Sequence, residues 1–266
     1  MAPHERTAVL GTFSLQLGAN HVVTVAELFA LFAHHGIDGY VCGGIVRDLL
    51  VGDPYNDIDF TFHAHIDDLR KILCKHYGPD IIQFYNRDFG LLKLGTDPDR
   101  LIDITMYRSA DSIGASTSLE DVRYGLGASL LEDARNRDLS INCMYWNDRS
   151  GLHDPLGHAM DDIAARRIRV AADPRKARID PRISMRSLLF QTRQYVLSPC
   201  THDYLLTHLD ANILCYPQDK FSDYVHALVR GRRESAHALY HAACGFLPAG
   251  TAREQLARAC NVGDAV

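Results

Sequence analysis

Apolar and polar residues alternate along this chain with two different periods. Helical spacing predicts helices over residues 24–36, 45–50, 65–77 and 129–137. Thr24 and Glu27 form a capping box at the start of the first helix, and Ser129 and Glu132 form another at the start of the last. Each helix therefore has either a capping box that marks its start or an apolar stripe that marks its buried face.

Strand spacing appears between these helices. It predicts five strands, at residues 39–42, 57–62, 80–85, 89–94 and 101–107. Residues 1–20 show no clear pattern and are expected to be an irregular lead-in. Residues 109–127 are rich in Ser, Gly and Asp, which predicts a mobile loop. Residues 147–151 predict a hairpin turn, and from residue 161 the pattern is helical to the end.

This order of elements indicates an α+β fold. We predict a mixed five-stranded sheet with helices, followed by an all-helical C-terminal domain. The boundary is placed after residue 160, which gives domains 1–160 and 161–266. A chain of 266 residues is long enough for one large domain or two modest ones.

Composition narrows the class of protein. Hydrophobic residues make up 47% of the chain, and the net charge of −5 argues against a protein that coats nucleic acid without specificity. The 7 cysteines are scattered without a C-x-x-C pair, which predicts reduced core thiols in a cytoplasmic protein. Nothing resembles a signal peptide, and no apolar run approaches about 18 residues, so no membrane contact is expected.

Basic residues are concentrated in one stretch of this acidic chain. They are Arg166, Arg167, Arg169, Arg175, Lys176, Arg178, Arg182 and Arg186, against Asp173 and Asp180. A local basic surface is compatible with RNA binding. A solvated helix face explains the same pattern equally well, and both interpretations stay open.

Two features near residue 50 carry candidate chemistry. Gly43 and Gly44 follow an apolar run and open a short helix, whose unpaired N–H groups and dipole suit phosphate. Asp57 and Asp59 lie two residues apart in a predicted strand and therefore project to the same side. Such a pair can hold two divalent cations about 3.5–4 Å apart, as in phosphoryl-transfer enzymes. Either feature alone is more often a plain turn or a solvated strand end.

A third carboxylate interrupts a strongly apolar strand. Asp103 lies between Ile102 and Ile104, where a carboxylate is costly without a partner or a metal. The alternative is a strand-edge aspartate that points to water.

The stretch 43–59 resembles the signature of the tRNA nucleotidyltransferase/poly(A) polymerase family, which includes the class II CCA-adding enzymes. The family has Gly-Gly-x-Val-Arg-Asp-x-Leu-x-Gly followed by Asp-x-Asp. The resemblance implies a polymerase β-like nucleotidyltransferase palm as catalytic head (1–160) and a neck-like helical domain (161–266). It also implies two Mg²⁺ ions at Asp57, Asp59 and Asp103, with the triphosphate held by Gly43, Gly44 and Arg47.

Residues 135–142 resemble a second family motif, Arg-Arg-Asp-Phe-Thr-Ile-Asn-Ala. The resemblance implies that Arg137 contacts the phosphate or base, Asp138 the ribose hydroxyls, and Asn142 the sugar or metal region. A guanidinium fork suits phosphate, and a carboxylate accepts two hydroxyl hydrogens. Taken alone, the motif also fits a helix C-terminal arginine with a capping aspartate.

A third family motif, Glu-Asp-x-x-Arg followed by a further Arg, is altered here. In the family it selects CTP and ATP at the base edge. Ile179 and Ile183 stand at the Glu and first Arg positions, Asp180 and Arg186 match, and Arg182 is one residue out of place. We therefore expect an apolar base pocket and no ordered C-C-A addition. The nearest candidates for base recognition are Asp180, Arg182 and Arg186.

The resemblance covers residues 25 to about 197, and the tRNA-clamping parts of the family are expected to be absent or reduced. It implies transfer of a nucleoside monophosphate from an NTP to a hydroxyl, with an RNA 3′ end as acceptor, a two-metal mechanism and release of pyrophosphate. Two alternatives stay open: nucleotidylation of a small-molecule or protein hydroxyl, and a non-catalytic nucleotide- or RNA-binding module. The sequence does not predict the acceptor, the preferred NTP or the oligomeric state.

Overall fold

The computed structural model describes the chain except for residues 1–2, 19–20, 56, 98–100, 117–120 and 263–266. Its strands are β1 (Ser14–Gly18), β2 (His21–Thr24), β3 (Gly39–Cys42), β4 (Asp59–Phe62), β5 (Ile82–Asn86), β6 (Leu91–Leu94), β7 (Ile102–Met106), β8 (Tyr145–Asn147), β9 (Gly151–His153), β10 (Arg167–Ile168) and β11 (Val196–Leu197). Its α-helices are α1 (Pro3–Ala8), α2 (Val25–His34), α3 (Gly44–Val51), α4 (Ile66–Tyr77), α5 (Leu130–Ala134), α6 (Ala159–Ala164), α7 (Pro174–Ile179), α8 (Pro181–Thr192), α9 (Pro199–Leu214), α10 (Gln218–Leu228), α11 (Arg233–Cys244) and α12 (Thr251–Ala259).

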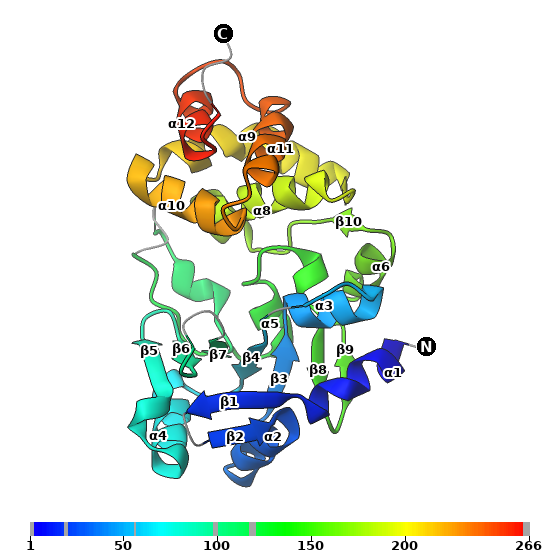
Figure 1. The fold of residues 1–266 in the computed structure, drawn as a ribbon, viewed down its shortest axis with the longest axis vertical. Helices are drawn as coiled ribbons and strands as arrows, with labels where there is room; N and C mark the ends of the chain where they lie inside the picture. Colours follow the sequence, from blue (N-terminus) through cyan, green and yellow to red (C-terminus); the bar gives the residue numbers. More distant parts are fainter. Residues whose placement is uncertain (1–2, 19–20, 56, 98–100, 117–120, 263–266) are drawn as a thin grey trace.

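The predicted α+β fold class is confirmed, with the sheet and α8–α12 in different parts of the molecule (Figure 1). The central sheet has the order β5-β6-β7-β4-β3-β8-β9. It is a mixed sheet. β4 runs parallel to β7, whereas β3 pairs antiparallel with β4 and β6 pairs antiparallel with β7. The predicted number of five strands is wrong: among the residues that the structure describes, 7 strands form the sheet. The two additional strands, β8 and β9, flank the predicted hairpin turn and are too short to show a period.

One face of the sheet is covered by α2 and α4. Phe29 and Phe32 of α2 contact Phe60 and Phe62 of β4, with ring centroids 5.8 and 4.2 Å apart for Phe29–Phe60 and Phe32–Phe62. Because side chains alternate along a strand, Asp59 then projects from the opposite face. The packing of aromatic rings on one face therefore leaves the other face for polar groups.

The expected irregular lead-in is wrong. Residues 3–18 form α1, a 3-10 turn and β1, and β1 pairs with β2. Leu15 and Leu17 of β1 are buried. An apolar alternation of only two residues was too short to predict this strand from the sequence. The predicted mobile loop at 109–127 contains buried Ile113, Val122 and Tyr124, and its residues 117–120 lie outside the described residues.

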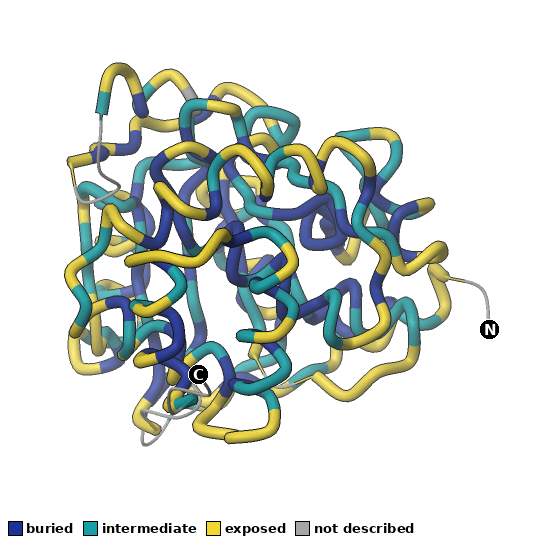
Figure 2. Tube along the Cα trace, turned by 90° about the horizontal axis from the view of Figure 1, so that it is seen from above, coloured by how far each residue is buried: buried dark blue, intermediate teal, exposed yellow. Residues whose placement is uncertain are grey.

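The C-terminal part is helical apart from the short parallel pair β10 and β11. Two hydrophobic clusters fill the molecule, and α8 contributes to both, with Ile183 in the first and Leu188 in the second. Figure 2 shows buried segments running through the interior and exposed segments at the periphery. The boundary at 160/161 stays a prediction. In the described part of the chain, no helix has the length and apolar character needed to cross a bilayer.

The cysteines are free thiols in the structure. Cys42, Cys143 and Cys260 are buried, as expected for core thiols. Cys200 and Cys215 are exposed, so the prediction is wrong for these two.

Candidate active site

A cleft lies between the central sheet and the helical part. Its main cavity has a volume of about 630 Å³ and is lined by residues of β4, β6, β7, α5, α7, α8 and α10. A second cavity of about 310 Å³ shares Asp57, Asp59, Arg186, Leu228 and Arg230 with it. The main cavity contains these predicted site residues: Asp57, Asp59, Asp103, Arg137, Asp138, Asp180, Arg182 and Arg186.

The three predicted carboxylates all line this cleft. Asp59 and Asp103 are direct neighbours in the parallel register of β4 and β7, and Asp57 lies two residues before Asp59. Burial raises the pKa of Asp59 to about 6, and the nearby charge of Asp103 adds to the rise, while Arg137 and Arg186 oppose it. A bound cation would relieve the repulsion within this carboxylate group.

Asp103 has a protein partner that the sequence did not reveal. Lys93 Nζ lies 2.7 and 2.8 Å from the two carboxylate oxygens of Asp103. The two residues are opposite each other in the antiparallel register of β6 and β7, and this pairing was the missed signal. The alternative of an aspartate that points only to water is therefore wrong.

The donor set is compatible with Mg²⁺, because all three candidate ligands are carboxylates. Among the described residues, no group of three or more His, Cys, Asp or Glu side chains is already arranged to hold a metal ion. Asp57 is largely exposed, with 65% of its side chain accessible, and Arg230 Nη2 lies 3.9 Å from its Oδ2. The metal roles of Asp57, Asp59 and Asp103 stay predictions.

The glycine pair brings backbone close to these carboxylates. Gly43 is the N-cap of α3 and has φ = 77°, a conformation that favours glycine. A Cβ at Gly43 would lie 2.9 Å from Asp59 Oδ2, and one at Gly44 would lie 3.3 Å from Arg47 Nη2. Glycine is therefore needed both for the turn and for the close approach of Asp59.

A chain of polar contacts joins α3 to α8 across the floor of the cleft. The buried Arg47 pairs with Asp48 at 2.7 Å, lies 4.8 Å over the ring of Phe190, and donates to Asn142 Oδ1. Asn142 donates in turn to Asp138 Oδ1 at 3.0 Å. Three predicted residues are thus connected, although 95 positions separate Arg47 from Asn142.

The chain of contacts ends at Arg186, whose Nη1 lies 2.8 Å from Asp138 Oδ2. Burial alone would raise the pKa of Asp138, but Arg186 and the hydrogen bond from Asn142 outweigh it, so the pKa lies below its usual value. Asp138 is therefore a charged carboxylate at the cleft with internal partners.

Arg137 is held between the sheet and α5. Its guanidinium donates to Tyr145 Oη at 2.8 Å, to Asp133 Oδ2 at 3.1 Å and to Cys42 Sγ at 3.0 Å. It also lies 5.0 Å over the ring of Tyr145. These partners fix the orientation of the guanidinium at the cavity wall. The alternative of a helix C-terminal arginine with a capping aspartate does not match, because α5 ends at Ala134 with Arg135 as its C-cap.

The expected apolar base pocket is wrong. Ile179 and Ile183 are buried in the first hydrophobic cluster and are not part of the cavity wall. Asp180 is the N-cap of α8 and Pro181 begins that helix, so the chain turns between α7 and α8 instead of continuing as one helix. This turn places Asp180 and Arg182 at the cavity, where Arg182 Nε and Nη2 each lie 2.7 Å from the Asp180 carboxylate.

Lys176 is a cavity residue that sequence reasoning did not single out. It is buried on α7, lines the main cavity and donates to the carbonyl oxygen of Asn136. Burial lowers the pKa of Lys176 to about 8, although Asp180 opposes the shift.

The basic stretch 166–186 is neither a single RNA-facing surface nor a solvated helix face. Most of its cations bind carboxylates inside the molecule: Arg167 and Arg169 to Asp162, Arg175 to Asp173, Arg182 to Asp180 and Arg186 to Asp138. Of its cations, Lys176 of α7 and Arg182 and Arg186 of α8 line the cleft.

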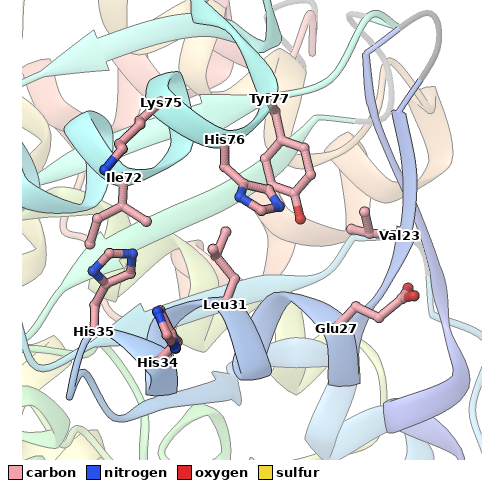
Figure 3. A pocket seen from close by; sticks show the side chains of 9 residues that line it. All are labelled: Val23, Glu27, Leu31, His34, His35, Ile72, Lys75, His76 and Tyr77. Carbon is pink, nitrogen blue, oxygen red and sulfur yellow. The ribbon is translucent and has the colours of Figure 1, made fainter.

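A larger cavity of about 670 Å³ lies on the other side of the sheet, between α2 and α4. Side chains of the two helices face each other across it, with Ile72 and Leu31 in its wall and His34 and His76 beside them (Figure 3). Its carboxylate, Glu27, is used in the capping box with Thr24. This cavity lacks the charged pairs that distinguish the cleft.

The mixed sheet and the cleft give this part of the chain an α+β, nucleotidyltransferase-like head fold. Residues 39–169 match the family model described as the poly A polymerase head domain. This match and the curated relatives support the resemblance of the head region to the tRNA nucleotidyltransferase/poly(A) polymerase family that the sequence predicted.

Curated relatives include two kinds of enzyme. The chain is 27% identical over 200 residues to the CCA-adding enzyme of Geobacillus stearothermophilus, which covers 70% of this chain and 46% of the relative. It is 24% identical over 169 residues to poly(A) polymerase I of Haemophilus influenzae, and the match covers 59% of this chain and 35% of the relative. The chain thus spans about half or less of the length of these relatives.

Solved structures show the same fold. The CCA-adding enzyme of Bacillus stearothermophilus in complex with CTP gives a TM-score of 0.65 at 21% identity, covering 88% of this chain and 56% of that one. A tRNA nucleotidyltransferase complexed with a primer tRNA and an incoming ATP analog gives a TM-score of 0.62 at 23% identity, covering 82% of this chain and 60% of that chain. The likeness in fold therefore extends beyond the predicted limit near residue 197.

Proposed function

We propose that this protein transfers a nucleoside monophosphate from an NTP to the 3′ hydroxyl of an RNA. The acceptor oxygen forms a bond to the α-phosphorus, the bond to the bridging oxygen of the β-phosphate breaks, pyrophosphate leaves, and the hydroxyl proton passes to water. The observation that carries the proposal is the Asp59–Asp103 neighbour pair on β4 and β7, in a cleft that also contains Asp57 and the Arg137–Asp138 motif.

Asp57 and Asp59 would hold Mg²⁺, with Asp103 beside it once its contact with Lys93 is exchanged for the metal. When bound, Mg²⁺ neutralises the phosphates and favours ionisation of the attacking hydroxyl. The N-terminus of α3, at Gly43 and Gly44, offers backbone N–H groups to the triphosphate. Arg47 supports this end of the cleft through its contacts with Asp48 and Asn142.

The nucleoside would lie toward α8. Asp138 accepts hydrogen bonds from the ribose, and Asn142 and Arg186 keep its carboxylate charged and oriented. Arg137 contacts the phosphate or the base from the opposite wall. The Asp180–Arg182 pair is the polar group best placed to meet the base edge.

The test is incubation of the protein with each labelled NTP, Mg²⁺ and total RNA, with Asp59→Ala as the control. Label in RNA that depends on Asp59 is the expected result. Label in the protein or in a small molecule would instead support a different acceptor. Binding of NTP without any transfer would support a non-catalytic module and overturn the proposal.

A further inference from the structure

The second cavity of the cleft is lined by arginines from three separate elements. Arg47 comes from α3, Arg193 is the C-cap of α8, and Arg230 and Arg232 come from the connection between α10 and α11. The cavity has a volume of about 310 Å³ and opens onto Asp57 and Asp59. Arg186 of α8 also lines this cavity, and it and Arg47 belong to the motifs that predicted the site. The other three belong to the helical C-terminal part.

The connection that carries Arg230 and Arg232 is a hydrogen-bonded turn with two residues in the left-handed conformation. Arg230 adopts φ = 52° and Gly231 φ = 64°, both in the left-handed region. The backbone N–H groups of Arg230, Gly231 and Arg232 donate to carbonyl groups of the preceding helical turn at 3.0–3.1 Å. A non-glycine residue in this conformation costs free energy, and such strain is concentrated at functional sites. The turn places Arg230 Nη2 at 3.9 Å from Asp57 Oδ2.

Arginines outnumber aspartates in the lining of this cavity, even with Asp48, Asp57 and Asp59 included. Burial, followed by the charges of Arg47 and Arg230, lowers the pKa of Arg193, and Arg232 contributes in the same direction. Asp48 offsets only part of this repulsion and already binds Arg47. A cluster of like charges around a cavity is stabilised when a polyanion binds there.

We propose that Arg193, Arg230 and Arg232 form a phosphate clamp that holds the β- and γ-phosphates of the NTP and then the pyrophosphate product. This inference rests on the proposed function and adds residues of the helical C-terminal part to the active site. Guanidinium groups are suited to this task because they donate in pairs to phosphate oxygens.

The position of the cavity favours the triphosphate over the phosphates of an RNA acceptor. It lies against Gly44 and Asp57, beside the N-terminus of α3, where the triphosphate is expected. Its limited volume suits a short chain of phosphates. The main cavity, of about 630 Å³, remains for the nucleoside and the acceptor end.

The experiment measures equilibrium binding of ATP, AMP, inorganic tripolyphosphate and a single-stranded RNA, each alone, by calorimetry with Mg²⁺. The variants are Arg230→Gln and Arg232→Gln, with Arg193→Gln as a third arginine outside the turn. The matched control is Arg233→Gln, an exposed arginine next to Arg232 that does not line the cavity. Thermal unfolding of each variant verifies that it is folded.

We expect each clamp variant to bind ATP and tripolyphosphate about tenfold more weakly or worse, because a charge-assisted hydrogen bond is lost. Binding of AMP and RNA, and all binding by Arg233→Gln, should be unchanged. Equal weakening of ATP and AMP, unchanged ATP binding, or weakened RNA binding alone would overturn the clamp. A wild type that binds ATP no more tightly than AMP would also overturn it. If ATP binding depends on the clamp arginines but the wild type transfers no label to RNA, the proposed function is overturned and the clamp is not.

Discussion

Asp57 and Asp59 differ in their surroundings although they are two residues apart. Asp59 lies within the cleft next to Asp103, whereas Asp57 is largely exposed beside Arg230. If both hold the metal, the loss of either carboxylate leaves developing charge without compensation. Asp57→Ala and Asp59→Ala should therefore each lower the rate of nucleotidyl transfer by several powers of ten without unfolding the protein. The measurement is the single-turnover rate, and residual activity above about a tenth of wild type in either variant would place the metal elsewhere.

Lys93 makes a separate prediction possible, because it competes with a cation for Asp103. Its ammonium lies 2.7 and 2.8 Å from the two carboxylate oxygens, so a cation that binds Asp103 must displace it. Lys93→Met should lower the Mg²⁺ concentration that gives half-maximal activity, since it removes this competitor. A titration of activity against Mg²⁺ measures the effect. Lys71→Met is the control, because Lys71 pairs on the surface with Asp68. An unchanged or higher Mg²⁺ requirement would show that Lys93 supports the site instead.

Lys176 predicts a pH dependence of stability. The pKa of this buried lysine is about 8 in the folded protein, against its usual 10.5. Its protonated form is therefore disfavoured by folding, and this cost is fully present below pH 8 and disappears as the pH rises through 10.5. The Tm of the wild type should rise relative to that of Lys176→Met between about pH 8 and pH 10. Parallel Tm curves over this range would contradict the shift.

The candidate residues themselves were predictable from the sequence, but their partners were not. The motifs that contain Asp57, Asp59, Arg137 and Asp138 are short, so their spacing can be recognised directly in the sequence. Lys93 meets Asp103 only through strand register. Likewise Asn142 meets Arg47 only through the packing of α3 against the segment that follows α5.

At the scale of elements, the start of α3 approaches the candidate carboxylate Asp59 closely at Gly43. Gly43→Ala should abolish most transfer activity, because the new Cβ would lie 2.9 Å from Asp59 Oδ2 and displace that carboxylate. Its positive φ of 77° adds a backbone cost of about 1–3 kcal/mol. Gly36→Ala is the matched control, because Gly36 has φ = 71° and a Cβ added there would meet no atom within 4 Å. The measurements are Tm and transfer rate for both variants. Similar losses of activity in the two would show that strain alone is responsible.

The elements predicted well are those with a complete period and a clear end. α2 starts at its predicted capping box, and α3 ends at Gly52, which adopts the left-handed conformation. β8 and β9 have only three residues each, which is too few for an alternation to be recognised. The turn between α7 and α8 was missed because the pattern from residue 161 was interpreted as helical to the end, although Pro181 marks a helix start.

For the whole molecule, α8 connects the two hydrophobic clusters and lines the cleft. Its buried face contacts both clusters, while Arg182 and Arg186 project into the cavities. The candidate site is therefore shared between the sheet and the helices, and we expect helix packing to control which polar groups reach a bound base. This sharing could not be predicted from motifs, because it depends on how the sheet and the helices pack.

The choice of nucleotide follows from this arrangement. Arg182 and Asp180 bind each other, and Arg186 binds Asp138, so the groups nearest the base already have partners. As long as these ion pairs stay closed, only shape differences select the base, and they provide roughly 1–3 kcal/mol of discrimination. We therefore expect mixed 3′ ends, without ordered C-C-A addition, on a tRNA that ends before its first C and is supplied with CTP and ATP.

Sequencing of the product 3′ ends provides the measurement. Arg182→Met should change the ratio of C to A added, because it frees the Asp180 carboxylate to accept a hydrogen bond from the base. Arg178→Met is the control, since Arg178 is an exposed residue of α7 that does not line the main cavity. Clean stops at C-C-A by the wild type would show that the Asp180–Arg182 pair opens and reads the base edge. In that case Arg182→Met should destroy the order of addition while Arg178→Met preserves it.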